Sequence, residues 1–233
     1  MARQVVIDCF PESLARYRDG WTVVAVDVIR ATTTAVTAVA SGRACYPAAS
    51  LDSALALAAA LENPLLVGEL GGSMPFGFEL NNSPAALVRR ADVERPMVLL
   101  STTGTRLFCE TGPRDAVYAA CLRNRTAQVE QLIGHHDRVA VIGAGARGEF
   151  REEDQLACAW IAERLVQAGY EPAGPTAGLI DRWRGAPVDV IATGKSAEYL
   201  RRTSQLDDLE FILDHVDDLD ATFRLNGQGV MMS

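Results

Sequence analysis

Short apolar runs alternate along the chain with segments whose apolar residues recur at helical spacing. The runs are rich in Val, Ile, Leu and Ala, which is typical of strands buried on both faces of a sheet. Besides a strand at the N-terminus, we predict strands over 21–30, 43–48, 64–69, 96–102, 115–120 and 138–144. Between them, we predict helices over 31–42, 51–62, 85–91, 126–134 and 152–169.

This alternation predicts an α/β fold, because strand–helix–strand repeats form parallel sheets with right-handed crossovers. We expect three layers, α/β/α, around a largely parallel or mixed sheet. The pattern weakens in the last part of the chain, where 178–185, 196–203 and 206–220 are helical or mixed in character. We therefore expect an α/β core over 1–170 and a C-terminal extension over 171–233 that packs on the same fold, with one continuous domain as the alternative.

Composition excludes several classes of protein. The 233-residue chain is 48% hydrophobic and carries a formal net charge of −8, which argues against binding to nucleic acid or to an anionic membrane surface. No apolar run reaches the ~20 residues that span a bilayer, and the N-terminus lacks the apolar core of a signal peptide. We expect a cytoplasmic protein in a reducing compartment, with its scattered cysteines buried as small apolar residues. These are Cys9, Cys45, Cys109, Cys121 and Cys158.

Polar residues gather where four of the predicted strands end. Ligands of open parallel sheets bind at the carboxyl ends of strands, so we expect these residues to share one site. In chain order they are Asp27, Arg30, Thr32, Thr33 and Thr34; then Glu69; then Ser101, Thr102, Thr103, Gly104 and Thr105; and finally Gly143, Gly145, Arg147, Glu153 and Asp154.

The chemistry of this set suits a small phosphorylated anion. Helix N-termini offer free N–H groups, threonine hydroxyls can donate to phosphate oxygens, and Arg30 and Arg147 supply forked donors. Carboxylates repel an anion unless a cation bridges them, and hard oxygen ligands suit Mg²⁺. We therefore expect Asp27, Glu69 and Asp154 to lie near Mg²⁺.

The segment 71–84 is rich in Gly, Asn and Pro. A loop of this length inside a compact domain is usually functional. Asn82 and Ser83 are its candidate donors to the substrate.

Each of these features has a structural alternative. Threonines at a helix start often cap the helix, and acidic residues there can complement its dipole. Asp27 lies in an apolar run and can pair with Arg30 instead of binding a metal. The histidines, His135, His136 and His215, are expected at the surface.

Two further motifs suggest other classes of enzyme. Gly143, Gly145 and Gly148 spell the G-x-G-x-x-G of a dinucleotide site directly after a strand. A polar stretch separates them from the next helix, and 170–178 predicts no strand, so a nucleotide-dependent oxidoreductase is only an alternative. Asp27 is followed two residues later by Ile29 rather than by a second Asp, which argues against an aspartyl nucleophile of the haloacid-dehalogenase type.

Several short blocks, taken together, resemble the 2-phosphosulfolactate phosphatases, a ComB-like α/β family. Their order and spacing agree from about residue 22 to residue 160, and each block alone is weak. The blocks are DVIRATT (27–33), GE (68–69), GFELNNSP (77–84), STTGT (101–105), AG (144–145), ED (153–154) and KS (195–196).

The resemblance implies a Mg²⁺-dependent phosphoric monoester hydrolase that converts 2-phosphosulfolactate to sulfolactate and phosphate, on the route to coenzyme M. A non-catalytic anion-binding protein on the same frame is the alternative from another class, and a homodimer remains open. With the strand-end set, the resemblance leads us to expect catalytic roles for Asp27, Arg30, Glu69 and Asp154. The expected substrate contacts are Thr32, Thr33, Asn82, Ser83, Thr102, Gly104, Thr105, Gly145 and Arg147.

The chain also departs from the family pattern. Leu70 stands where the family has Arg, Glu79 where it has Asp, Asn81 where it has Gly, and Thr103 where it has Asn. An arginine at position 70 could pair with a second acidic group on the substrate, whereas leucine cannot. We therefore predict poor handling of phosphosulfolactate and a preference for a phosphoester with one fewer anionic group.

Overall fold

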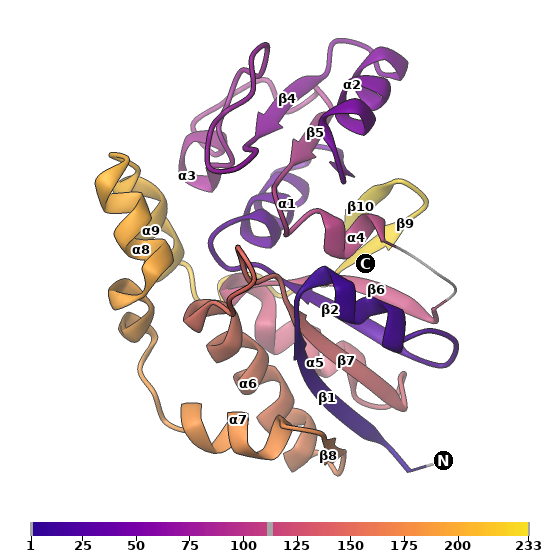
Figure 1. Ribbon diagram of the computed structural model, residues 1–233. Helices are drawn as coiled ribbons and strands as arrows, with labels where there is room; N and C mark the ends of the chain where they lie inside the picture. The colour runs from indigo at the N-terminus through magenta and orange to yellow at the C-terminus, as the bar shows by residue number, and fades with distance from the viewer. Residues whose placement is uncertain (1, 111–113, 233) are drawn as a thin grey trace.

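One mixed sheet of ten strands organises the computed structural model of the chain, which describes residues 2–110 and 114–232 (Figure 1). The strand order is β4-β5-β3-β10-β9-β6-β2-β7-β1-β8. Two sets of parallel strands form most of the sheet, and the last two strands of the chain join them. The α/β class and the mixed, mostly parallel sheet predicted from the sequence are confirmed.

Four of the five strands in the larger parallel set are runs that the sequence predicts as strands, and β8 is the exception. The central strand of this set, β2, shows why its apolar run has no polar break. Val24 and Val26 pack on one face with α6 (Glu152–Gln167), while Val23 and Ala25 pack on the other face with α1 (Ala31–Ala40). A strand buried on both faces has no polar side. The strands of this set are β1 (Gln4–Cys9), β2 (Thr22–Val26), β6 (Ala116–Ala120), β7 (Arg138–Gly143) and β8 (Glu171–Ala173).

A smaller parallel set and a hairpin complete the sheet. The hairpin strand β9 pairs antiparallel to β6, and its partner β10 pairs antiparallel to β3. Following these pairings across the hairpin, the smaller set runs opposite to the larger one. The strands are β3 (Cys45–Ala48), β4 (Leu65–Gly68), β5 (Met97–Leu100), β9 (Phe223–Asn226) and β10 (Gly229–Met232).

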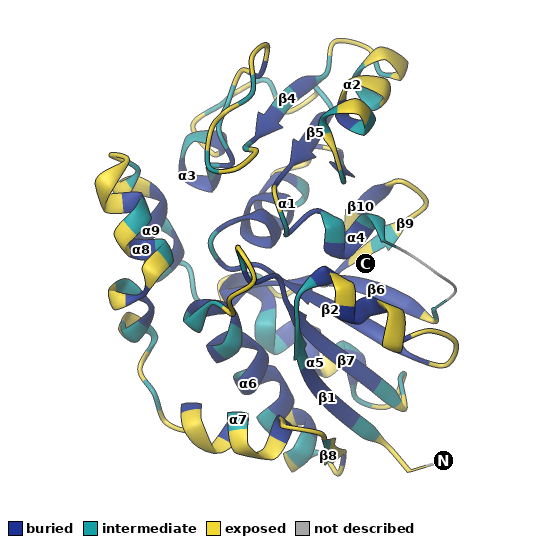
Figure 2. Cartoon of the chain, viewed as in Figure 1, coloured by how far each residue is buried: buried dark blue, intermediate teal, exposed yellow. Residues whose placement is uncertain are grey.

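Helices cover both faces of the sheet and give the three layers that the sequence predicts (Figures 1 and 2). The inner face of α6 is buried, whereas the outward faces of α2, α7 and α8 are largely exposed (Figure 2). The helices are α1 (Ala31–Ala40), α2 (Leu51–Ala60), α3 (Pro84–Leu87), α4 (Arg106–Cys109), α5 (Arg125–Leu132), α6 (Glu152–Gln167), α7 (Thr176–Trp183), α8 (Lys195–Arg202) and α9 (Leu206–Asp214).

The C-terminal segment differs from the expectation. Within the expected C-terminal extension, only helical or mixed segments were predicted individually, yet this part of the chain also supplies β8, at one edge of the sheet, and the hairpin in its middle. The expectation that 170–178 holds no strand was wrong, because β8 pairs with β1 there. The hairpin turns through Gly227 and Gln228, and Gly227 has φ 60°, which suits the first position of a two-residue hairpin turn.

The cysteines are free thiols. Cys45, Cys121 and Cys158 are buried, as expected of small apolar side chains, whereas Cys9 and Cys109 are only partly buried. Within the described parts of the chain, no helix combines the length and the apolar character that crossing a bilayer requires.

His136 is not the surface residue that the sequence suggests. Its Nδ1 lies 2.8 Å from the Thr22 hydroxyl and its Nε2 lies 3.1 Å from the Tyr118 hydroxyl, so the ring bridges β2 and β6 near their N-terminal ends. Burial lowers the pKa of His136, and the nearby charge of Arg224 adds to that effect. The folded protein therefore favours the neutral ring.

We expect the contribution of His136 to the free energy of unfolding to decrease as the pH falls below about 6.5, the ordinary pKa of histidine. The unfolded chain binds the proton more readily than the folded chain, so protonation favours unfolding. Chemical denaturation across about pH 5–8 measures this slope. The free energy of unfolding of the wild type should therefore fall relative to that of His136→Gln as the pH decreases, whereas His135→Gln, at the exposed neighbouring position, should follow the wild type. An unchanged slope in His136→Gln would contradict the assignment.

Candidate active site

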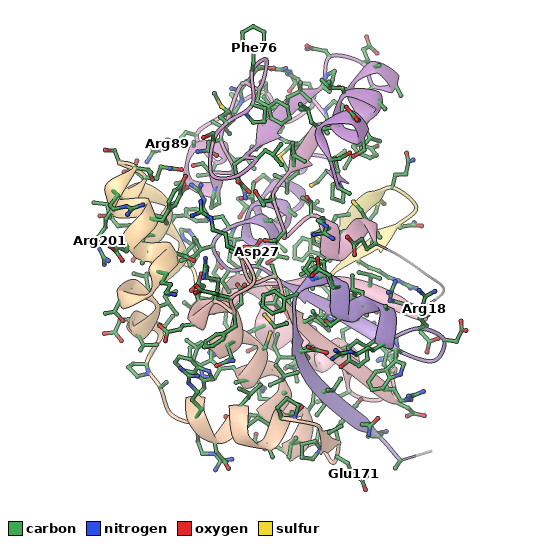
Figure 3. All side chains as sticks on the ribbon, in the orientation of Figure 1. Arg18, Asp27, Phe76, Arg89, Glu171 and Arg201 are labelled. Atoms are coloured by element: carbon green, nitrogen blue, oxygen red, sulfur yellow. The ribbon has the colours of Figure 1, made fainter. Side chains whose placement is uncertain are left out.

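A cleft of about 480 Å³ opens where the carboxyl ends of the two strand sets meet. Asp27 follows β2, Glu69 follows β4, Ser101 follows β5 and Gly145 lies just beyond β7, and all four line the cleft. Asp27 lies near the middle of the molecule (Figure 3). The strand ends that were expected to share one site do meet, but they come from two strand sets of opposite direction rather than from one parallel edge.

Acidic and basic side chains line the cleft in equal numbers. Such a lining suits a small charged molecule together with a cation. The acidic residues are Asp27, Glu69, Glu149, Asp154 and Glu198, and the basic residues are Arg30, Arg147, Arg151, Lys195 and Arg202.

Asp154 holds two loops together at the floor of the cleft. Its Oδ1 accepts a hydrogen bond of 2.8 Å from the Val28 N–H, and its Oδ2 accepts one of 3.3 Å from the Gly145 N–H. Because Val28 follows Asp27, this bond brings the loop that carries Asp27 against the start of α6. Both carboxylates are almost fully buried.

Gly104 leaves room for the Asp27 carboxylate. A Cβ atom at position 104 would lie 2.0 Å from Asp27 Oδ2 and 2.5 Å from the Cβ of Ala31. The role of Gly104 is therefore to let the backbone approach Asp27 closely, and it is absent from the residues that line the cleft.

Burial raises the pKa of Asp27 to about 7. The charges of Glu153 and Glu69 act in the same direction, while the Ala31 N–H and the charge of Arg30 oppose them. Burial, followed by the charges of Asp27 and Glu153, also raises the pKa of Asp154 well above its ordinary value. Without a cation, this group of carboxylates therefore retains protons near neutral pH.

Glu153 is the third member of this group and is only 1% exposed. Burial raises its pKa, which the Ser196 hydroxyl partly offsets. Even so, neither carboxylate oxygen makes a hydrogen bond of regular geometry with the described residues. A Cβ on Gly194 would lie 3.6 Å from Glu153 Oε2, which places this carboxylate beneath the start of α8.

The carboxylate oxygens of Glu69 accept hydrogen bonds from the loops around it. Its Oε1 accepts a hydrogen bond of 2.7 Å from the Thr102 N–H, and its Oε2 accepts bonds from the Thr102 hydroxyl at 2.8 Å and from the Gly72 N–H at 2.7 Å. Glu69 thus ties the loop after β4 to the loop after β5. Its charge still reaches Asp27.

The residues fit a magnesium ion that keeps part of its water shell. Among the residues described, no three or more His, Cys, Asp or Glu side chains are grouped as a complete metal cage. Mg²⁺ is commonly held by one or two carboxylates, together with water and substrate phosphate. The buried pair of Asp27 and Asp154, with the unpartnered oxygens of Glu153 close by, offers such a donor set.

Arg30 does not pair with Asp27, which was the structural alternative for that carboxylate. Its Nη1 donates to Asp208 in a buried ion pair and, at 2.7 Å, to Gln205 Oε1. Arg30 nevertheless lines the cleft. Sequence reasoning missed Asp208, although this acidic residue lies on the apolar face of α9 with Leu209 and Ile212, which was a readable signal.

The hydroxyl groups of four expected substrate contacts make hydrogen bonds within the protein. The Thr32 hydroxyl donates to Asp27 O, the Thr33 hydroxyl to Val28 O and the Thr105 hydroxyl to Ser101 O. Ser83 caps α3 by accepting from the Ala86 N–H, and it donates to Asp208. None of the four lines the cleft, so these hydroxyls shape the loops rather than the ligand surface.

The other expected contacts do reach the cleft. Asn82, Thr102, Gly145 and Arg147 line it, and the buried Asn82 Oδ1 has no hydrogen-bond partner among the described residues. Arg147 is exposed and makes no ion pair within the described chain. Thr103, at a position where the family has Asn, donates to Gly145 O at 2.9 Å.

One wall of the cleft was not assigned from the sequence. It comes from α8, where Lys195 Nζ lies 2.6 Å from Glu149 and the Tyr199 hydroxyl donates to Gly72 O at 2.5 Å. Arg202 lines the same wall. The KS block at 195–196 was a signal in the sequence, but the sequence alone does not show that this block lies beside the strand ends.

The glycine motif does not form a dinucleotide site. Ala146 and Glu149 pair with each other as a tight turn, and α6 begins only at Glu152. In a dinucleotide fold, the helix opens within the motif so that its N-terminus faces the pyrophosphate. The geometry therefore gives no support to the oxidoreductase alternative.

Comparisons with known proteins find similar sequences over most of the chain. A family model described as 2-phosphosulpholactate phosphatase matches residues 9–225. A probable 2-phosphosulfolactate phosphatase of Gloeobacter violaceus is 30% identical over 214 residues, which is 90% of each chain. One from Parasynechococcus marenigrum is 32% identical over 195 residues, covering 79% of this chain and 81% of the relative. One from Pseudothermotoga lettingae is 39% identical over 143 residues, 61% of each chain.

Gly104→Ala should destabilise the folded protein, because the added methyl group must displace the Asp27 carboxylate or the start of α1. Overpacking of this kind costs about 1–3 kcal/mol, which a chemical denaturation curve resolves. Gly178→Ala in α7 is the matched control, since nothing lies within 4 Å of its Cβ, and it should be neutral or slightly stabilising. Equal stability of the two variants would show that the contact at Gly104 has been misjudged.

Proposed function

Because the chain belongs to the 2-phosphosulfolactate phosphatase family, a family of phosphoric monoester hydrolases, we propose that it releases phosphate from 2-phosphosulfolactate with the help of Mg²⁺. The product, sulfolactate, would then belong to the route to coenzyme M. The rest of this proposal concerns how the residues of the cleft perform that hydrolysis.

The observation that carries the proposal is a buried carboxylate pair at the floor of a cleft with basic walls. Burial raises the pKa of both Asp27 and Asp154, the charge of Asp27 raises the pKa of Asp154 further, and neither carboxylate has a basic side chain in ion-pair contact within the described chain. Buried charges of like sign are costly unless a cation or a proton compensates them. A cation at this floor and an anion between the walls would together neutralise the cleft.

The residues then divide into two groups. Asp27 and Asp154 would hold Mg²⁺, with Glu69 contributing charge while its oxygens orient the neighbouring loops. When bound, Mg²⁺ supplies neutralisation of phosphate charge and orientation for in-line attack. Arg30 and Arg147 would bind the anionic groups of the substrate. Either a water molecule at the carboxylates or Asp27 itself can serve as the nucleophile.

A panel of phosphomonoesters assayed with and without Mg²⁺ tests the proposal. We expect Mg²⁺-dependent phosphate release by the wild type and none by Asp27→Asn. The variant should remain folded, and without Mg²⁺ it should be at least as stable as the wild type, because it removes one of the buried like charges. Both properties are measurable, by phosphate release and by thermal unfolding.

Asp137→Asn is the control for this variant. Asp137 is exposed and lies just before β7, at the end of the strand away from the cleft, so its removal should leave turnover unchanged. Wild-type rates and metal dependence in Asp27→Asn would make Asp27 a structural residue. Phosphate binding without turnover of any ester would favour the non-catalytic alternative.

Leu70 bears on the choice of substrate. It lies between Glu69 and Gly71, which both line the cleft, and its own side chain is 47% exposed. Leu70→Arg would add a guanidinium at this rim. A charge-assisted hydrogen bond contributes about 1.5–3 kcal/mol, so we expect kcat/KM for phosphosulfolactate to rise about ten- to a hundredfold.

The gain in Leu70→Arg should be confined to substrates with a second anionic group. A phosphomonoester that lacks one is the internal control, and Leu55→Arg, on exposed α2, controls for the added charge. No gain despite an intact fold would show that Arg147 or another basic residue of the cleft already holds the second anion.

A further inference from the structure

Asp208 is a buried centre of hydrogen bonds just behind the cleft. It is 2% exposed and lies in the first turn of α9. Its Oδ2 accepts from Arg30 Nη1, and its Oδ1 accepts from the Ser83 hydroxyl at 2.6 Å and from the Ala85 N–H at 3.1 Å. One carboxylate thus joins α9, the start of α3 and the loop after β2.

The bonds of Arg30 use only one of its nitrogens. Nη1 carries two protons, and its two acceptors are Asp208 Oδ2 and Gln205 Oε1. Within the described chain, Nε and Nη2 have no acceptor. These two nitrogens form the parallel fork with which a guanidinium binds an oxyanion through two hydrogen bonds.

Two further hydrogen bonds fix the side chain of Gln205. Its Oε1 also accepts from Asn81 Nδ2 at 2.9 Å, and its Nε2 donates to the Thr203 hydroxyl at 2.6 Å. Asn81 stands at a position where the family pattern has Gly, and a glycine there could not make this hydrogen bond. Arg30, which is 5% exposed and lines the cleft, cannot turn without breaking these bonds.

We infer that Asp208 and Gln205 are positioning residues, which occupy Nη1 of Arg30 and thereby aim its Nε–Nη2 edge at a phosphate group in the cleft. This inference rests on the proposed phosphatase function and deepens it. Neither residue lines the cleft, so both act through Arg30.

The test uses inorganic phosphate as the probe, with affinity measured by calorimetry in the presence of Mg²⁺. Asp208→Asn should weaken phosphate binding about tenfold, because an arginine that is free to rotate loses its aligned fork. Gln205→Leu should cause a smaller loss. Asp207→Asn is the matched control. Asp207 forms an exposed ion pair with Arg89, which lies at the outer surface (Figure 3), so the phosphate affinity of this variant should match the wild type.

A double-mutant cycle separates positioning from general stability. Arg30→Gln should lose phosphate affinity, and Arg30→Gln/Asp208→Asn should bind as weakly as Arg30→Gln alone. The inference is overturned if Asp208→Asn weakens binding by the same factor in both backgrounds. Full affinity in both folded single variants, Asp208→Asn and Gln205→Leu, also overturns it. Should Asp208→Asn not fold, Gln205→Leu and its combination with Arg30→Gln decide the question.

The same measurements keep this inference apart from the proposed function. A wild-type protein that binds phosphate through the Arg30 fork but hydrolyses no phosphomonoester would contradict the function and support the positioning roles. If the wild type hydrolyses phosphomonoesters and kcat/KM is undiminished in Asp208→Asn and Gln205→Leu, the function is supported and the positioning roles are contradicted.

Discussion

Burying several carboxylates in one place is energetically unfavourable, and the site is organised around that cost. Asp27, Glu153 and Asp154 lie under the cleft with raised pKa values, and the nearest buried arginine is paired elsewhere. Only part of the cost is recovered inside the chain, through the hydrogen bonds that Asp154 accepts from the Val28 and Gly145 N–H groups and through the Ala31 N–H at Asp27. The remainder is available to favour a bound cation, because the free energy of relieving repulsion adds to the free energy of binding.

The loops around the carboxylates are fixed before any ligand arrives. Glu69 joins the loops after β4 and β5, Asp154 joins those after β2 and β7, and Tyr199 reaches across to Gly72. Each tie crosses between segments that are distant in sequence, and each uses a polar side chain that could otherwise have been taken for a ligand group. A preorganised cleft of this kind loses little conformational entropy when the substrate binds.

The sequence predicted the strands and helices whose apolar pattern is local, and it placed Asp27 correctly at the end of a buried strand. It could not show how hydroxyls would be used: Thr32 and Thr33 are equally suited to bind phosphate or to cap the backbone, and the neighbouring carbonyls decide between them. Asp208 contacts Arg30 only through the tertiary fold, so no spacing rule connects the two. The hairpin around Gly227 is short, and its strands were not predicted, so the sequence did not reveal where the two strand sets join.

That hairpin has a consequence for the order in which the protein can fold during synthesis. β9 and β10 lie in the middle of the sheet, but they leave the ribosome after all the other described strands. Until then, β6 and β3 each present an edge of unpaired backbone groups, and such edges are prone to pair with other chains. The nascent chain therefore carries two incomplete half-sheets until this hairpin is made, and the hairpin then covers both edges at once.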